Sequence, residues 1–421
     1  MKVELQINNS TSANARYVGW APSPCRIRVT DPSGTIARTV DVTLSNVSAA
    51  TGGVVIFRTG STGRFSSTLT LSVPTNGKTV PFFVAGSRAS INDRDVTIEA
   101  RAKPSGVLRP IIVPIKGTLV GSIKVMVRIR KNAEALTSGE RDRFVSAFAT
   151  LNDQGAGRFA DFRSMHTFVS QPQAHGAPGF LPWHRAYLLD LERELQAIDH
   201  SVALPYWRFD AAAPNLFTQD FIGTSGPNGA VQFSNTNPLQ FWVTDGVQGI
   251  TRSPRNNWNP ATQPGPTIIT EAQTLALGAQ YSAFDDMEGN PHGTAHTRWD
   301  GFIRSIDTAA KDPLFFLLHC NVDRLWAKWQ RQNARFDSTV AASFTGDPNN
   351  PIGHNLNDTM WPWNGVTGGS RPPTAPGGSL ASSPCVTAPG AQPQVKNMLD
   401  YHGAVNATAR EGFDYDDVKF V

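Results

Sequence analysis

The chain has 421 residues, 40% of them hydrophobic and 17% charged, so it is too long for one small module and too apolar for a disordered tail. Its formal net charge of +4 is uneven, because residues 1–124 hold 15 Lys and Arg against 6 Asp and Glu, while residues 125–421 hold 23 against 28. The three cysteines include no CxxC pair, which argues against a disulfide framework, thiolate metal sites and a redox dithiol.

The composition also changes near residue 125. None of the nine histidines and only one of the ten tryptophans, Trp20, lie before that point. Together with the difference in charge, this predicts two domains, one over residues 1–124 and one over residues 125–421.

The first domain alternates short β-branched runs with turn residues. Seven or eight short strands with frequent turn signals are typical of an antiparallel β-sandwich, and we predict an immunoglobulin-like domain. Its arginines are scattered singly without interleaved aromatic residues, so we expect solvated strand faces and no nucleic-acid partner. The predicted strands are VELQI, RIRV, VDVTL, VVIF, STLTLSV, VPFFVA, DVTIEA and IIVPI.

The second domain has helical periodicity. The segment TSGERDRFVSAFATLND, with Glu140 in its first turn, predicts a helix that begins near Ser138. In a later segment, Asp312 is a candidate N-cap and Pro313 suits the first helical position. Residues 211–287 are rich in Asn, Pro, Gly and Thr, which predicts long surface loops. Four further segments predict a four-helix bundle, and with it an α+β multidomain fold: FADFRSMHTFV, WHRAYLLDLERELQAI, PHGTAHTRWDGFIRSI and DPLFFLLHCNVDRLWAKWQRQ.

Six histidines lie on or beside these four segments, in two groups of three. His292 and His296 are four residues apart, so on a helix they share one face and can chelate a single ion. An isolated HxxxH pair is weak evidence, and each histidine alone could be an ordinary core residue. Six imidazoles on inward-facing segments, however, are costly to desolvate without a metal. The six are His166, His175, His184, His292, His296 and His319.

Two sites of three imidazoles each favour particular metals. They lack the oxygen ligands that calcium, magnesium and manganese prefer, which leaves zinc, copper and iron. Iron in helix bundles usually takes Glu-x-x-His motifs, and paired zinc hydrolases usually use a bridging carboxylate. Copper has the highest affinity for nitrogen ligands in the divalent series, so two copper ions are the best fit.

Several of these segments resemble the type-3 copper proteins, the family of tyrosinases, catechol oxidases and haemocyanins. HGAPGFLPWHRAYLLDLERELQ, ALPYWRFD, PHGTAH and DPLFFLLHCNVDRLWAKWQ resemble its two copper-binding regions, and IGHNLNDTMWPW, MLDYHGA and FDYDD resemble the end of its bacterial catalytic domain. The resemblance spans residues 125–421 and implies an enzyme that oxidises phenols to o-quinones with dioxygen. It implies one copper ion on the first group of histidines and one on the second.

Departures from the family pattern refine the expected activity. The position after the first histidine of the second copper site is often Asn in members that hydroxylate monophenols, and here it is Gly293. Glu288 resembles the family's water-holding Glu, and Ile306 matches the position whose side chain overhangs the first copper in relatives. The resemblance therefore implies oxidation of o-diphenols or o-aminophenols. A full tyrosinase that hydroxylates monophenols, a haemocyanin-like oxygen carrier and a dizinc hydrolase are the alternatives.

Other residues have expected structural roles. Gln173 stands where many plant and fungal members carry a cysteine that is joined to a copper ligand, and Cys320 is expected to be a small packed residue. Arg185, Asp323 and Arg324 resemble buried residues that orient helices and imidazoles. Three histidines outside the motifs are expected to be non-ligands: His200, His354 and His402.

The expected partners are a phenolic small molecule and dioxygen, with no nucleic acid and no membrane, and the sequence leaves oligomerisation open. No apolar run approaches the roughly twenty residues that a membrane-spanning helix needs. The start, MKVELQINN, lacks the apolar core of a secretory signal. We therefore expect a cytoplasmic protein, with export alongside a signal-bearing partner as the alternative.

Overall fold

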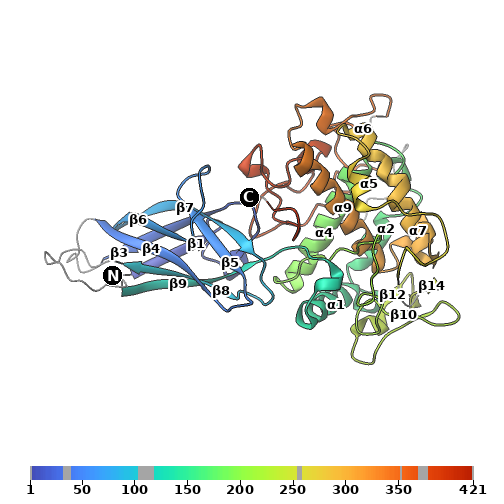
Figure 1. Ribbon diagram of the computed structural model, residues 1–421, viewed down its shortest axis with the longest axis horizontal. Helices are drawn as coiled ribbons and strands as arrows, with labels where there is room; N and C mark the ends of the chain where they lie inside the picture. The colour runs from blue at the N-terminus through green and yellow to red at the C-terminus, as the bar shows by residue number, and fades with distance from the viewer. Residues whose placement is uncertain are drawn as a thin grey trace.

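The computed structural model describes residues 2–31, 39–102, 118–253, 258–350, 353–367 and 378–419. It is a mixed α+β structure, in which a β-rich N-terminal region extends away from a helical region (Figure 1). None of the helices in these ranges combines the length and the apolar character that crossing a bilayer requires.

The β-rich region consists of two sheets that share one apolar core. All strand pairs are antiparallel except that of β2 with β9. The first sheet has the order β1 (Lys2–Ile7), β3 (Ser23–Thr30), β7 (Asn76–Arg88) and β5 (Val54–Arg58). The second has the order β2 (Tyr17–Val18), β9 (Thr118–Val127), β8 (Val96–Ala102), β4 (Thr39–Ser48) and β6 (Thr68–Pro74).

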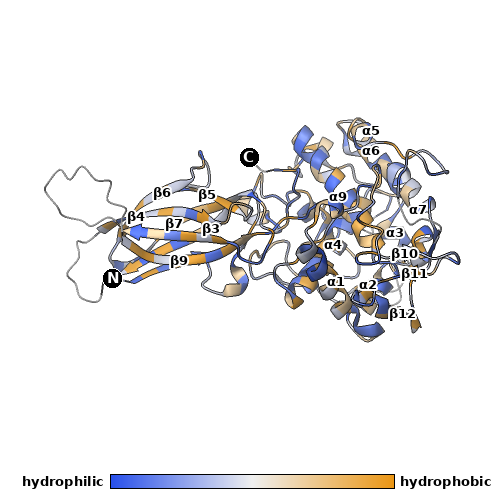
Figure 2. Ribbon diagram, turned by 60° about the horizontal axis from the view of Figure 1, so that its bottom comes forward, coloured by the Kyte–Doolittle hydropathy of each residue, from blue (hydrophilic) through white to orange (hydrophobic). Residues whose placement is uncertain are grey.

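Alternation of apolar and polar residues places this core. In β8, Val96, Ile98 and Ala100 are fully buried while the residues between them are not, as expected when successive side chains point to opposite faces of a sheet. Along the strands, orange and blue residues alternate in Figure 2. Side chains from both sheets, such as Ile27 and Val42, meet in the same cluster.

Seven of the eight predicted strand runs lie within β1 and β3–β8 or begin one residue before them, and the eighth, IIVPI, lies outside the described residues. The sequence did not predict β9. Its residues run through position 125, where the change in composition placed the boundary between the two domains. This strand ends at Val127, two residues beyond the predicted start of the second domain. Its last two residues, Met126 and Val127, pair with β2, and composition carries no signal of this pairing.

The helical region is built around two long helices, α4 (Phe180–Ile198) and α9 (Leu314–Asn333). Both bury most of their residues, which identifies them as central helices rather than surface helices. The other helices are α1 (Ser138–Asn152), α2 (Phe159–Met165), α3 (Gln171–Ala174), α5 (Glu271–Leu275), α6 (Tyr281–Phe284), α7 (Thr294–Thr297) and α8 (Ile306–Ala309). Two-residue strands complete it: β10 (Thr224–Ser225), β11 (Val231–Gln232), β12 (Val243–Thr244), β13 (Val247–Gln248), β14 (Arg252–Ser253) and β15 (Asp300–Gly301).

Local sequence sets where two of these helices begin. The N-cap of α1 is Thr137, whose side chain forms a capping box with Glu140, so the cap lies one residue before Ser138. At α9, the Asp312 carboxylate accepts a hydrogen bond from the Leu314 backbone N–H (Oδ1–N 2.9 Å). That carboxylate also forms a buried salt bridge with Arg252.

The third predicted bundle segment, PHGTAHTRWDGFIRSI, is not one continuous helix. Residues 289–293 form a π-helical turn, and α7 ends at Thr297. The chain then turns into β15, which pairs with β14. Gly301 has φ +89°, and a Cβ at this position would lie 2.2 Å from the Thr251 carbonyl oxygen. Close approach of two backbones therefore ends the helix, an effect that helical periodicity does not report.

The C-terminal segment joins the two regions. Trp20, in the β-rich region, donates its indole N–H to the Tyr415 carbonyl oxygen (2.7 Å) and its backbone N–H to the Asp414 carboxylate (2.7 Å). On the other side, the Tyr415 hydroxyl donates to the Asp323 carboxylate of α9 (2.5 Å), which is also paired with Arg130 (3.1 Å). This segment therefore links the β-rich region to the interior of the helical region.

Candidate metal centre

The structure brings the six predicted histidines together as two triads. In each triad, one ring nitrogen from every histidine lies within 4.8 Å of those of the other two. The side chain of His175 is half-buried, and the other five are buried. The first triad is His166, His175 and His184, and the second is His292, His296 and His319.

Backbone carbonyl groups orient two rings of the first triad. The Nδ1 of His166, at the end of α2, donates to the Ile306 carbonyl oxygen (3.1 Å), and the Nδ1 of His184, in α4, donates to that of Phe180 (2.9 Å). Because Nδ1 carries the proton, Nε2 keeps its lone pair in both rings. These two Nε2 atoms are buried without a hydrogen-bond partner. Such an arrangement is costly unless a cation receives the lone pairs.

The second triad has the same design. The Nδ1 of His292 donates to the Glu288 carbonyl oxygen (2.8 Å), and the Nδ1 of His296 donates to that of Ile303 (2.6 Å). Their Nε2 atoms each lie 3.3 Å from the Nε2 of His319, which is fully buried in α9. Three Nε2 atoms therefore converge, as required for binding one ion.

The two triads face each other across the contact between α4 and α9. The rings of His184 and His319 stack with their centroids 4.2 Å apart and their planes 11° apart. The rings of His175 and His292 are 6.4 Å apart. Two ions bound in the triads would thus be close neighbours, and the site is suited to a dinuclear metal centre.

Burial keeps all six imidazoles neutral. It lowers the pKa of every one, to about 3 for His166 and about 4 for His296, and the positive charge that neighbouring histidines would carry lowers several further. Neutral rings offer lone pairs at neutral pH. The donor set contains only imidazole nitrogen, which fits copper better than the oxygen-seeking cations.

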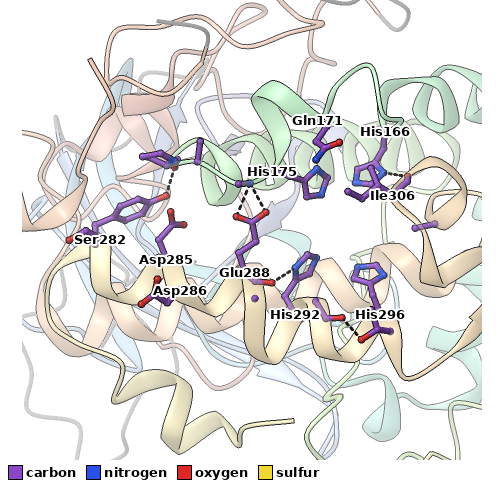
Figure 3. Close-up of a pocket in the computed structure, with 18 of the residues that line it drawn as sticks. His166, Gln171, His175, Ser282, Asp285, Asp286, Glu288, His292, His296 and Ile306 are labelled. Carbon is purple, nitrogen blue, oxygen red and sulfur yellow. Dashed lines mark hydrogen bonds between the residues drawn. The ribbon is translucent and has the colours of Figure 1, made fainter. Parts of the chain in front are cut away.

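A cavity of about 850 Å³ opens onto both triads. Figure 3 shows His166 and His175 on one side, and His292 and His296 on the segment opposite. The Glu288 carboxylate spans the gap, and its two oxygens share one bifurcated hydrogen bond from the Gly176 backbone N–H (2.8 and 3.0 Å). Burial raises the pKa of Glu288 to about 7.

The other two predicted catalytic positions also line this cavity. Ile306 is half-buried, and Gly293 leaves the wall between His292 and His296 without a side chain. Sequence reasoning missed Asp285, which lines the same cavity and whose pKa burial raises to about 8. The acidic run DDME was visible in the sequence, but nothing in it distinguishes a cavity wall from a solvated surface.

The remaining expectations concern residues around the triads. Gln173 is buried and accepts a hydrogen bond from the Trp361 backbone N–H (2.8 Å), and Cys320 lies near the Leu204 carbonyl group, outside both triads. Arg185 forms a buried salt bridge with Asp323. Three further residues also lie outside the triads: His200, His354 and His402.

Comparison with known proteins agrees with this geometry. The common central domain of tyrosinase matches residues 156–332. The tyrosinase of Streptomyces glaucescens is 34% identical over 267 residues, covering 56% of this chain and 92% of that protein. Grixazone synthase of Streptomyces griseus is 28% identical over 288 residues, covering 54% and 93%. A functional unit of octopus hemocyanin has a TM-score of 0.45 and 22% identity, covering 69% of each chain. On the sequence matches, this chain belongs to the tyrosinase family of copper-dependent oxidoreductases.

Proposed function

We propose that this protein oxidises o-diphenols and o-aminophenols to o-quinones and quinone imines with dioxygen. The observation that carries the proposal is a cavity of about 850 Å³ that opens onto four clustered imidazoles. A cavity of this size lies in the usual range for small-molecule sites and accommodates a single aromatic ring.

The proposal assigns the two triads as copper ligands. The first triad would hold one ion and the second triad the other, in both cases through neutral imidazole nitrogen. The orphaned Nε2 atoms of His166 and His184 support this assignment, because a bound cation would satisfy them. When bound, the copper pair supplies the electron transfer between the phenolic substrate and dioxygen.

Three cavity residues have proposed roles toward the substrate. Glu288, held by the Gly176 N–H, accepts a proton from the substrate hydroxyl group, and its raised pKa suits this transfer near neutral pH. Ile306 provides an apolar wall for the aromatic ring. Gly293 offers no side-chain hydrogen bond, which supports a preference for o-diphenols over the less acidic monophenols.

The position of the cavity supports an enzyme rather than an oxygen carrier. The residues that line it lie between positions 166 and 345, and none belongs to the described part of the β-rich region. Oxygen carriers of this family shield the dioxygen site from phenols with an additional domain. The described residues of the β-rich region give no such cover, which supports access of phenols to the centre.

The test is turnover by the copper-loaded protein on catechol, an o-aminophenol and tyramine at equal concentration. We expect kcat/KM for the first two to exceed that for tyramine by about 10-fold or more. Equal rates on tyramine would identify a full tyrosinase. Reversible dioxygen uptake without quinone formation would identify a carrier, and retention of zinc in preference to copper would support the dizinc hydrolase.

We further propose that residues 1–124 form an immunoglobulin-like domain, and that residues 125–421 form a catalytic domain with a four-helix bundle around the metal centre. Two separate apolar cores support two domains, one core shared by the two sheets and one in the helical region, although the core of the sheets extends to Ile129. α2, α4, α7 and α9 supply the bundle, because each carries or adjoins a triad histidine.

A further inference from the structure

The loop between α3 and α4 supplies one member of the first triad, His175. This residue is half-buried on the cavity wall, and its Nδ1 is buried without a hydrogen-bond partner. By contrast, the Nδ1 atoms of His166 and His184 are each bonded to a carbonyl oxygen. The direction of the His175 ring therefore depends on the path of its own loop.

Both ring nitrogens of a distant histidine hold that loop. His354 is fully buried; its Nε2 donates to the Pro172 carbonyl oxygen (2.6 Å), and its Nδ1 accepts from the Gly179 backbone N–H (3.0 Å). The two contacts lie on either side of His175, three residues before it and four residues after it. One neutral imidazole thus fixes both ends of the segment that presents the ligand.

Other contacts between the same two segments reinforce this arrangement. The Gln173 side-chain oxygen accepts from the Trp361 backbone N–H (2.8 Å). A Cβ on Gly179 would lie 2.7 Å from the His354 Nδ1, so the loop passes too close to the ring for any side chain. His354 is itself held, because its backbone N–H donates to the Asp358 carboxylate (3.1 Å).

We propose that His354 is a positioning residue that keeps the loop of residues 172–179 in the path that aims His175 at the first triad's ion. The proposal rests on the proposed function, in which His175 is a copper ligand. His354 itself belongs to neither triad. It acts through the backbone on either side of the ligand, just as outer hydrogen bonds elsewhere orient ligating side chains directly.

The test is copper affinity, measured by titration against a competing chelator. His354→Phe keeps an aromatic ring but removes both hydrogen bonds, so the buried Gly179 N–H loses its acceptor and the Pro172 carbonyl loses its donor. Loss of such outer contacts typically weakens metal binding by about 10- to 100-fold. We expect this weakening for one of the two ions and no change for the other.

Two conservative variants separate positioning from general stability. His354→Asn retains an acceptor for the Gly179 N–H, and His354→Gln retains a donor for the Pro172 carbonyl group. Each should restore part of the lost affinity at the one weakened site. If His354→Phe does not fold, the copper affinities of these two variants test the proposal. The proposal fails if they bind copper more weakly at both sites equally, or at neither site.

The matched control is His402→Phe. His402 is also buried, lies outside both triads and contacts the Asp414 carboxylate at the junction of the two regions. This variant should lower the Tm without weakening one copper site selectively. If the unaltered protein binds fewer than two copper ions, the proposed function fails. If it binds two and His354→Phe binds both with unchanged affinity, only the positioning role is overturned.

Discussion

The two triads have the same ligands but are assembled differently. In the second triad, His292 and His296 come from one short segment, their Nδ1 atoms bond to carbonyl groups four and seven residues away, and His319 is fixed inside a long buried helix. In the first triad, His175 sits on a loop that is held by a residue from a remote part of the chain. Local backbone contacts therefore orient two rings of the second triad, whereas contacts from remote segments orient His166 and hold the His175 loop in the first.

The segment of the second triad also supplies the acidic side of the cavity. Asp285, Asp286 and Glu288 precede His292 on the same stretch of chain, and all three line the cavity. Figure 3 shows them in a row along that segment. The segment that carries His292 therefore supplies both ligands and acidic side chains, whereas the loop that carries His175 supplies a ligand.

The largest expected effect is on the second triad. His319→Ala removes the ligand that stacks on His184, so we expect loss of one copper ion and a fall in catechol turnover of at least ~100-fold, beyond the loss from an outer contact. Metal content and initial rates measure both. The neighbouring variant Cys320→Ala is the control, and it should retain two copper ions. Retention of two tightly bound ions by His319→Ala would remove His319 from the ligand set.

A pair of glycine substitutions compares the two triads directly. In Gly179→Ala the new Cβ would lie 2.4 Å from the Gly353 carbonyl oxygen, so the loop of the first triad must move, at a cost of about 1–3 kcal/mol. In Gly293→Ala the nearest atom would be 3.2 Å away, and φ there is ordinary for any residue. We expect copper affinity to fall by about 10-fold only in Gly179→Ala. Equal effects in the two variants would contradict the comparison.

A polar substitution at Gly293 tests the part of the cavity wall beside the second triad that has no side chain. Gly293→Asn places an amide between His292 and His296 at the cavity. One added hydrogen bond is worth about 1 kcal/mol, so the ratio of monophenol to diphenol turnover should rise by about 5-fold. The ratio of kcat/KM on tyramine and catechol measures this, with Gly293→Ala as the size control. An unchanged ratio would show that Gly293 does not limit monophenol turnover.

The last prediction concerns the acidic side of the cavity and is measured on stability rather than on copper binding or turnover. Burial raises the pKa of Asp285 from 3.8 to about 8, so the folded protein retains a proton that the unfolded chain loses. The stability from this group is therefore present below about pH 4 and is lost as pH rises towards 8. Its slope is at most about 1.4 kcal/mol per pH unit. In Asp285→Asn this slope should disappear, as measured by urea unfolding between pH 5 and 8, and an identical slope in both proteins would contradict the assignment.

The sequence predicted the parts of the molecule that leave a periodic or compositional signal. Alternating runs located β1 and β3–β8, and clustered histidines together with the family resemblance identified both triads. Spacing alone justified only the pairing of His292 with His296. His354 was expected to be a non-ligand because it lies outside the motifs. Its contacts to Pro172 and Gly179 were not predicted, because they span 182 and 175 residues of chain and leave no local pattern.

The junction at Trp20, Asp414 and Tyr415 has a consequence for how the molecule melts. Detaching the C-terminal segment would remove the Tyr415 hydrogen bond to the buried Asp323 carboxylate, and a hydrogen bond to a charged group is typically worth about 1.5–3 kcal/mol. Neither region can open at this junction without disturbing the other. Calorimetry on the intact chain should therefore record a single cooperative transition, despite the two separate apolar cores.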